Sequence, residues 1–205
     1  ELTASDSRSV TVTNTAQSIG LNVSQPVGFA PFPAAFFLQI PSSITVQSIS
    51  VQFGDGGSFN GSDPNVEPRH RYEQPGIYQV DLIVQDTDQN QYNTSRRIVV
   101  LDLIEQRETV CSVYAHLKSR LTADDANGAA QAFHVYRRQR YQNLFDALGA
   151  NRPIAATRLG QIANGTFSIN DASLILVNLD PGDVINGYPI RFALDGSGVW
   201  RIISM

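Results

Sequence analysis

The sequence predicts a multidomain chain, in which an all-β sandwich is followed by an α+β domain of helices packed on an antiparallel meander sheet. Two changes near residue 102 support this division. Apolar residues recur with a period of about two before this point, as in strands, and of about 3.6 after it, as in helices. The charge also shifts, because five arginines and ten acids precede Leu103, whereas nine arginines, one lysine and nine acids follow from there. We therefore expect a domain boundary at residues 101–104.

The composition excludes several classes of protein. With 205 residues, 42% of them hydrophobic and 17% charged, the chain can bury a core and is not a solvated disordered polymer. No apolar run approaches the roughly 18 residues of a membrane-spanning helix. Neither half is basic enough to indicate nucleic-acid binding. Cys111 is the only cysteine, which excludes an intrachain disulfide and a cysteine-rich metal site.

Six short runs in the first half have the length and residue pattern of strands. Turn-forming residues separate them, as in an antiparallel sandwich. Glycines within 54–57 can adopt positive φ, and Asp86–Asn90 offers side chains that cap a hairpin turn. The expected strands are Val10–Thr13, Ile19–Val23, Ala35–Ile40, Val46–Phe53, Ile77–Val84 and Arg96–Leu101.

Several motifs of this half occur in a family order. An apolar strand follows Pro26–Pro31, and then come VQFGDG at 51–56, HRY at 70–72, PGIYQV at 75–80 and LIVQD at 82–86. Over about residues 19–102 they resemble the PKD (polycystic-kidney-disease) domain, although Val51 stands where that family usually has Trp. The resemblance implies an Ig-like sandwich that acts as a spacer, adhesion or ligand-binding module of a surface or secreted protein. It does not imply catalysis.

Residues 1–14 form a separate segment in this division. Their sequence echoes Leu82–Thr87 and Arg96–Val100, about one such domain away. We interpret them as closing strands left from an upstream repeat or, alternatively, as the first strand of the domain at 15–102. In both cases the strand is a candidate for pairing with the sheet edge of a neighbour, and self-assembly through it is one expected interaction.

The second domain, residues 103–205, is expected to begin with helices. Thr122 with Asp125 resembles a capping box that opens the second helix, Gly149 suits the end of the third, and Pro153 suits the first turn of the fourth. The expected helices cover 110–121, 122–133, 141–148 and 153–165, and the expected strands cover Thr166–Ile169, Ser173–Leu179, Ile185–Leu194 and Val199–Ile203.

The order of helices and then a meander is similar to cystatin-like and SnoaL-like (nuclear-transport-factor-like) cone domains. The similarity rests mainly on Leu121–Ala132 and on the ending Gly187–Met205. It implies helices on one face of a curved sheet. Members range from isomerases and dehydratases to domains without known chemistry, so this fold alone decides no activity.

The densest basic cluster of the sequence is the candidate binding site. Arginines at three of four consecutive positions lie between two tyrosines, and a histidine precedes them, which suits an acidic glycan, a phosphate or a protein partner. The alternative is an ordinary solvated helix face. The candidate residues are His134, Tyr136, Arg137, Arg138, Arg140 and Tyr141.

Two acidic segments are candidates for calcium, the only cofactor that the sequence suggests. Asp86 and Asp88 copy the start of a calcium loop, but its later positions lack the glycine and the closing carboxylate. Asp55 and Asp63 flank a glycine-rich loop. Hairpin and turn chemistry without an ion fits the same four residues.

No catalytic residue is expected. Most aspartates of the second half precede helices or lie in turns, where capping explains them. A catalytic or small-ligand-binding cone would use His116, His134 or Tyr141 in a cavity, and a pocket that joins two of them to an aspartate would favour it. A cavity filled by Phe133, Phe145, Leu194 and Trp200 would argue against it.

These observations predict a non-enzymatic interaction module from a larger surface or secreted protein, with a role in adhesion, spacing or assembly. The expected location is extracellular, at the cell surface or periplasmic. The expected partners are a protein or a glycan at a cell surface, with no nucleic acid and no membrane span. The alternatives are the cone domain described above and an accessory carbohydrate-binding module of an enzyme.

Overall fold

The computed structural model describes residues 18–180 and 184–205. The expected strand Val10–Thr13, and the whole segment 1–14, lie outside the described residues. Contacts divide the chain into two compact units. The first takes the described residues up to Pro26 together with Pro33–Tyr72 and Ile77–Val99, and the second takes Val27–Phe32, Glu73–Gly76 and Val100–Met205.

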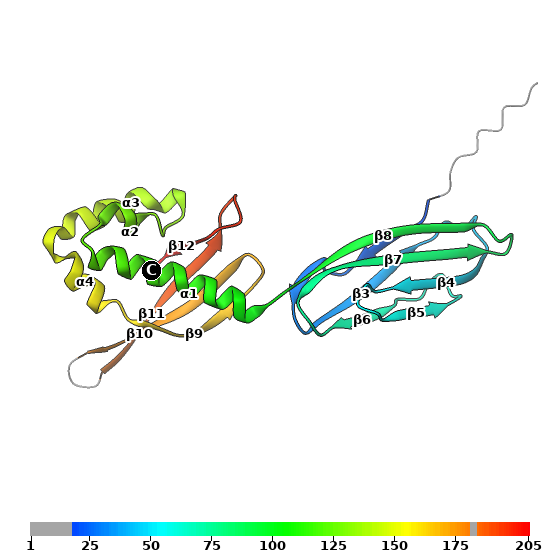
Figure 1. Ribbon diagram of the computed structural model, residues 1–205, viewed down its shortest axis with the longest axis horizontal. Coiled ribbons are helices and arrows are strands. Elements are labelled where there is room, and N and C mark those ends of the chain that lie inside the picture. Colours follow the sequence, from blue (N-terminus) through cyan, green and yellow to red (C-terminus); the bar gives the residue numbers. More distant parts are fainter. Residues whose placement is uncertain (1–17, 181–183) are drawn as a thin grey trace, which may run out of the picture. The chain divides into compact units, whose positions relative to one another are not determined.

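Eight strands form two sheets in the N-terminal half, as the sandwich prediction requires (Figure 1). The three-stranded sheet has the order β1-β3-β6, and the five-stranded sheet has the order β2-β8-β7-β4-β5. The strands are β1 (Gly20–Val23), β2 (Val27–Phe29), β3 (Phe32–Gln39), β4 (Val46–Gln52), β5 (Ser58–Gly61), β6 (Arg69–Tyr72), β7 (Gly76–Asp86) and β8 (Gln91–Leu101).

Alternation of apolar residues builds the sandwich core. On β7, Val80, Leu82 and Val84 are fully buried, and Leu82 lies opposite Val51 of β4. Val51 is itself fully buried. Because valine is smaller than the usual Trp, other rings help to fill this core, and Phe53 packs with its centroid 5.5 Å from that of Phe36.

Five of the expected strands are confirmed, with some different ends. The strand expected at Arg96 begins at Gln91, directly after the hairpin that follows Asp86, and β8 is hydrogen-bonded to β7. The prediction omitted β2, β5 and β6. Each has only three or four residues, which is too short to show a long alternation of apolar and polar residues. The expected positive φ angles occur at Gly54 and Gly56.

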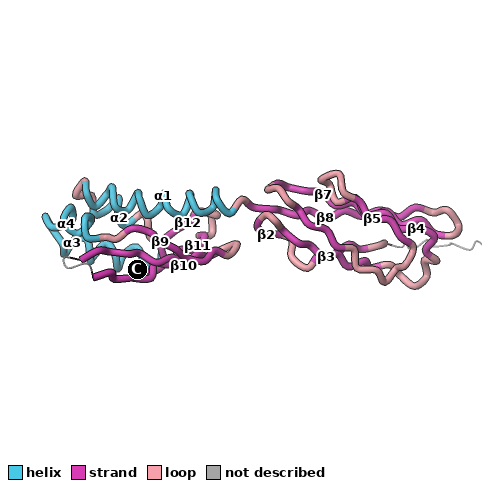
Figure 2. Tube along the Cα trace, turned by 90° about the horizontal axis from the view of Figure 1, so that it is seen from below, coloured by secondary structure: helices cyan, strands magenta, loops and turns pink. Residues whose placement is uncertain are grey.

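Helices and a meander sheet form the C-terminal half, which confirms the predicted α+β class. The sheet has the order β12-β11-β10-β9, and the helices lie on one side of it (Figure 2). The helices are α1 (Leu103–Thr122), α2 (Ala126–Ala130), α3 (Val135–Leu148) and α4 (Arg152–Arg158), with a 3-10 turn at Gly149–Asn151. The strands are β9 (Gln161–Phe167), β10 (Asp171–Asp180), β11 (Val184–Leu194) and β12 (Trp200–Ser204).

The core of this half lies between α1 and the inner face of the sheet. Asp102 caps α1 by accepting hydrogen bonds from the backbone N–H of Ile104 and of Glu105. Trp200 is buried on β12, and its indole N–H donates to Gln106 of α1 at 2.9 Å. The helix thus enters the unit with its first turns fixed to the last strand of the sheet.

Several boundaries in this half differ from the prediction: α1 begins at Leu103 and not near residue 110, α3 begins at Val135 and not near residue 141, α2 covers only Ala126–Ala130, and the strand expected at Thr166 begins at Gln161. Thr122 ends α1 and its hydroxyl donates to the carbonyl of Lys118, while Asp125 alone caps α2 by accepting from the N–H of Gly128 at 2.7 Å. The fourth helix ends at Arg158 and not near residue 165. Just before β9, the backbone passes so close to β10 that a Cβ at Gly160 would lie 2.4 Å from the carbonyl oxygen of Val177, so this position requires glycine.

Candidate binding surface on helix α3

Helix α3, which carries the predicted basic cluster, is attached to the last strand at its start. The backbone N–H of His134 donates to the carbonyl of Ile202, and Ile202 donates to Ala132, both at 2.9 Å. The carbonyl of His134 then accepts from the N–H of Arg137 and Arg138. No side chain caps this helix start. The arginines are therefore held on a helix whose first turn has a fixed position within the second unit.

Tyr141 belongs to the core and not to the surface. Its ring stacks on Phe133 with centroids 3.7 Å apart, and it is 7% exposed. Its hydroxyl lies 3.2 Å from both the backbone N and the carbonyl O of Met205. The structure thus separates Tyr141 from the other residues of the predicted binding cluster, because its side chain is buried in the core.

The remaining residues form a surface that we call the basic stripe, defined as Tyr136, Arg137, Arg138 and Arg140. Tyr136 is 88% exposed, and its ring lies 5.1 Å from the ring of His134. Arg137 and Arg140 are exposed and stand one helical turn apart. Within the described part of the chain, none of the three guanidinium groups has a hydrogen bond or an ion pair with another residue.

Arg138 is the least exposed member of the stripe. Its Nε is buried, and within residues 18–180 and 184–205 it has no hydrogen-bond acceptor. A buried donor without an acceptor costs about 1–3 kcal/mol. An acceptor supplied by a bound molecule would remove this cost.

A small apolar cavity lies beside the stripe. It has a volume of about 200 Å³ and is lined by α1, α3, α4 and Met205. Leu144 of α3, which is 52% exposed, contributes to its lining. Tyr141 is the only one of the predicted cone-site residues in this lining.

The structure does not assemble the predicted catalytic alternative. His116 is exposed on α1. His134 is the N-cap residue of α3 and is half-buried. Of the four side chains expected to fill a cone cavity, Phe133, Phe145 and Trp200 are in the core of the second unit, and Leu194 is partly buried and packs against that core. Cys111 is partly buried in α1.

Three of the four aspartates considered for calcium, Asp55, Asp63 and Asp86, already have protein partners. Asp55 accepts from the N–H of Gly57 at 3.0 Å and lies 2.6 Å from Nε2 of His70. Burial opposes ionisation of Asp55, yet the hydrogen bonds from His70 and Gly57 outweigh it and lower the pKa of this carboxyl. Asp63 accepts from the N–H of Asn65 at 2.9 Å, as expected in a turn.

Asp86 organises the hairpin between β7 and β8. Its carboxylate accepts from the side-chain amide and backbone N–H of Asn90 and from the hydroxyl of Tyr92. The side-chain hydrogen bond from Asn90 is the largest influence that lowers its pKa. Asp88 is exposed in the same turn. In the part of the chain that the structure describes, no three His, Cys, Asp or Glu side chains gather as a metal site would require.

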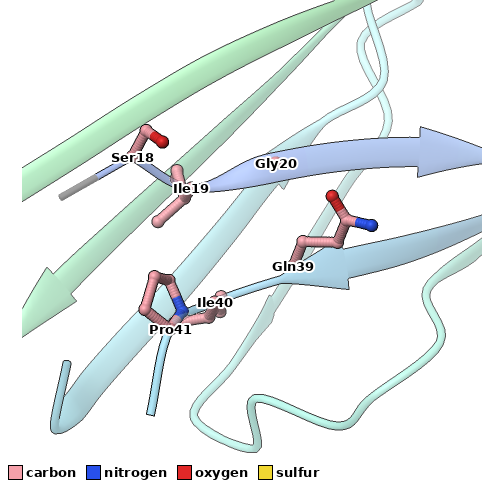
Figure 3. A pocket seen from close by; sticks show the side chains of 6 residues that line it. All are labelled: Ser18, Ile19, Gly20, Gln39, Ile40 and Pro41. Carbon is pink, nitrogen blue, oxygen red and sulfur yellow. The ribbon is translucent and has the colours of Figure 1, made fainter. Parts of the chain in front are cut away.

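A shallow hollow marks the start of the first described strand. Ser18, Ile19 and Gly20 face Gln39, Ile40 and Pro41 across a volume of about 440 Å³ (Figure 3). The Gln39 side chain covers Gly20, where a Cβ would lie 2.7 Å from its Oε1. Strand β1 is at one edge of its three-stranded sheet.

Comparison with known proteins identifies one part of the chain. Residues 33–100 match the family model of the PKD domain, which confirms the predicted resemblance over most of its span. No curated protein matches the sequence significantly. In the part of the chain that the structure describes, no helix is long and apolar enough to span a membrane.

Solved structures give distant similarities. The PKD1 domain of the Vibrio cholerae metalloprotease PrtV is 18% identical, with a TM-score of 0.34, and the match covers 40% of this chain and 94% of that one. The PKD1 domain of Vibrio anguillarum Epp is 22% identical, with a TM-score of 0.33 and coverage of 42% and 96%. A Campylobacter jejuni protein described as an NTF2-like transpeptidase is 11% identical, with a TM-score of 0.33 and coverage of 51% and 100%.

Proposed function

We propose that this chain, whose residues 33–100 match the PKD domain family, is a non-enzymatic interaction module of a larger secreted or surface protein, and that it binds an anionic partner through the basic stripe of α3. One observation carries the proposal. Three arginines occur within the first six residues of a helix, and no described residue neutralises them. The partner carries carboxylate, sulfate or phosphate groups, as acidic glycans and acidic protein segments do.

This arrangement is unfavourable for the isolated helix. The start of a helix carries a partial positive charge, and each exposed cation there costs about 0.3–1 kcal/mol at low ionic strength. The first turn of α3 has no acidic residue, and Asp146, the only acid of the helix, lies in its last turn. Like charges at Arg137 and Arg140 add a smaller repulsion. A bound anion would offset all of these costs and could also supply an acceptor for Arg138.

The net charge of the chain is negative, so binding of an anionic partner would not result from the overall charge of the protein. At −4, the whole protein has no general attraction for polyanions at neutral pH. Binding of an anionic partner must therefore come from a local surface. In this proposal the stripe is that surface, and Tyr136 adds an exposed aromatic face next to the charged groups.

We assign the two halves separate roles within this proposal. Residues 15–102 form an Ig-like spacer or adhesion domain, and residues 103–205 form the domain that carries the stripe. The proposed location is extracellular, at the cell surface or periplasmic, in keeping with the PKD match. Adhesion, spacing or assembly of the larger protein is the corresponding biological role.

Chromatography on immobilised heparin, a sulfated polysaccharide, tests the proposal. The wild-type chain should be retained at low salt and elute as sodium chloride screens the arginines. The double variant Arg137→Gln/Arg140→Gln should pass without retention. Arg107→Gln/Arg191→Gln is the matched control, since it removes two exposed arginines elsewhere in the same half. Equal elution of the two double variants would refute the proposed surface.

A further inference from the structure

The cavity beside the basic stripe has the properties of a binding site for an apolar group. Its walls are almost entirely aliphatic and aromatic, with Leu117 and Leu121 of α1 fully or nearly fully buried on one side. Leu144 and Met205, which are 52% and 40% exposed, reach from the cavity to the surface. An empty apolar space forfeits dispersion contacts along its whole lining. Filling it with an apolar group therefore gains energy without burying an unpaired polar atom.

The size of the cavity limits what can enter. A dry cavity of about 150 Å³ lined by aliphatic and aromatic side chains holds benzene. At about 200 Å³, this one suits a ring of that size or a folded alkyl chain of about six carbons. A longer chain would have to leave through the side at Leu144.

Leu144 connects the cavity to the basic stripe. It follows Arg140 by four residues and Arg137 by seven, so all three lie on one side of α3. At 1.5 Å per residue, the axial separations are about 6 Å and about 10 Å. An apolar group in the cavity and an anionic group on the arginines can therefore belong to one small molecule.

We infer that the second unit binds a small anionic amphiphile, with its apolar group in the cavity beside Leu144 and its carboxylate or sulfate on Arg140 and Arg137. This inference rests on the proposed function, because it uses the same arginines. It adds the ligand class, since a purely polar anion would leave the cavity unfilled. Charge complementarity orients the head group, and the cavity selects the length of the apolar part.

Nuclear magnetic resonance titration of the full chain with hexanoate tests the inference, with acetate and hexan-1-ol as the two halves of the ligand. Hexanoate should give saturable shifts of the Leu117 and Leu144 methyl signals. Hexan-1-ol should give the same shifts at a dissociation constant about tenfold higher, and acetate should give none in this range. Equal affinity for hexanoate and hexan-1-ol would overturn the role of the arginines.

Variants separate this inference from the proposed function. Ala155→Phe fills the cavity and should abolish hexanoate binding while heparin retention persists. Ala115→Phe, at an exposed position of α1 outside the cavity lining, is the matched control and should bind normally. If Ala155→Phe does not fold, Leu144→Gln provides a polar change at a half-exposed position and should weaken hexanoate binding about tenfold.

The outcomes are distinguishable. Heparin retention without hexanoate binding would overturn the inference and leave the proposed function standing. The inference would also be overturned if Arg137→Gln/Arg140→Gln lost heparin retention but still bound hexanoate as the wild type does. Saturable hexanoate binding that both Ala155→Phe and the arginine variant abolish would support it.

Discussion

The hydroxyl of Tyr141 joins both backbone polar groups of Met205, accepting from its N–H and donating to its carbonyl oxygen, each at 3.2 Å. The last residue of the sequence is thereby fixed to the buried face of α3. The same helix carries the exposed arginines Arg137 and Arg140. The position of the basic stripe consequently depends on this contact as well as on the backbone hydrogen bonds at His134.

Replacing Tyr141 with Phe should destabilise the second unit. The ring stack on Phe133 survives, but the N–H and carbonyl of Met205 lose their partner, at a cost of about 1–2 kcal/mol. Urea unfolding measures the change. Tyr136→Phe is the control. Because Tyr136 is 88% exposed, removal of its hydroxyl should leave the free energy of unfolding unchanged. Equal effects of the two variants would contradict the structural role of Tyr141.

Removing the charges of the stripe should not destabilise the fold. Arg137→Gln/Arg140→Gln relieves repulsion from the helix start and between the two cations, so the free energy of unfolding should stay constant or rise by about 0.5 kcal/mol at low salt. Urea unfolding at low and high sodium chloride measures this. A clear loss of stability would show that the arginines serve the fold and not a partner.

Two neighbouring glycines should respond differently to alanine. At Gly54, with φ +86°, a Cβ would also lie 2.5 Å from the carbonyl oxygen of Gln79. At Gly56, with φ +95°, nothing lies within 4 Å. Gly56→Ala should therefore cost only the positive-φ strain of about 1–2 kcal/mol, and Gly54→Ala should cost more. Thermal unfolding of the two variants compares them, and equal costs would contradict the close approach at Gly54.

Stability of the first unit should fall in acid through Asp86. The hydrogen bonds from Asn90 and Tyr92 lower the pKa of its carboxyl in the folded state. The stabilisation is therefore present above the pKa of the unfolded state, about 3.9, and is lost as the pH falls below it. The melting temperature should drop as the pH falls below about 4 and through the lower pKa of the folded state, and it should drop less steeply in Asp86→Asn. Asp88→Asn, at the exposed position of the same turn, should keep the wild-type slope. An unchanged slope in Asp86→Asn would refute this role.

The segment before Ser18 can be tested by deletion. If residues 1–14 pair with the sheet edge of a neighbouring copy, their removal should convert an oligomer to a monomer in light scattering after size exclusion. If they pair within the chain, their removal should instead lower the melting temperature. No change in either property would exclude both roles.

Sequence patterns predicted the architecture well because its main signals are local. The period-two runs around Val51 and Val84 and the glycines at 54 and 56 specify strands and a turn within short windows. The three strands that the prediction omitted have at most four residues, and their pairing depends on distant partners.

The candidate site was predictable only in part. The arginines of α3 are visible as a cluster in the sequence, but helix periodicity places Tyr141 on the same side as Arg137, so the burial of Tyr141 was not predictable from spacing. The cavity beside Leu144 brings α1, α3, α4 and Met205 together, and no local pattern records such a gap in packing. For the same reason, no local pattern indicates that Nε of Arg138 has no acceptor among the described residues.

If the basic stripe binds an anionic partner, amide-resolved titration with a sulfated heparin oligosaccharide should locate the binding on α3. Our account predicts that the chemical-shift changes concentrate on α3 between Val135 and Leu144, and that they disappear in Arg137→Gln/Arg140→Gln but persist in Arg107→Gln/Arg191→Gln. Changes confined to other surfaces, or unchanged in the stripe variant, would contradict it.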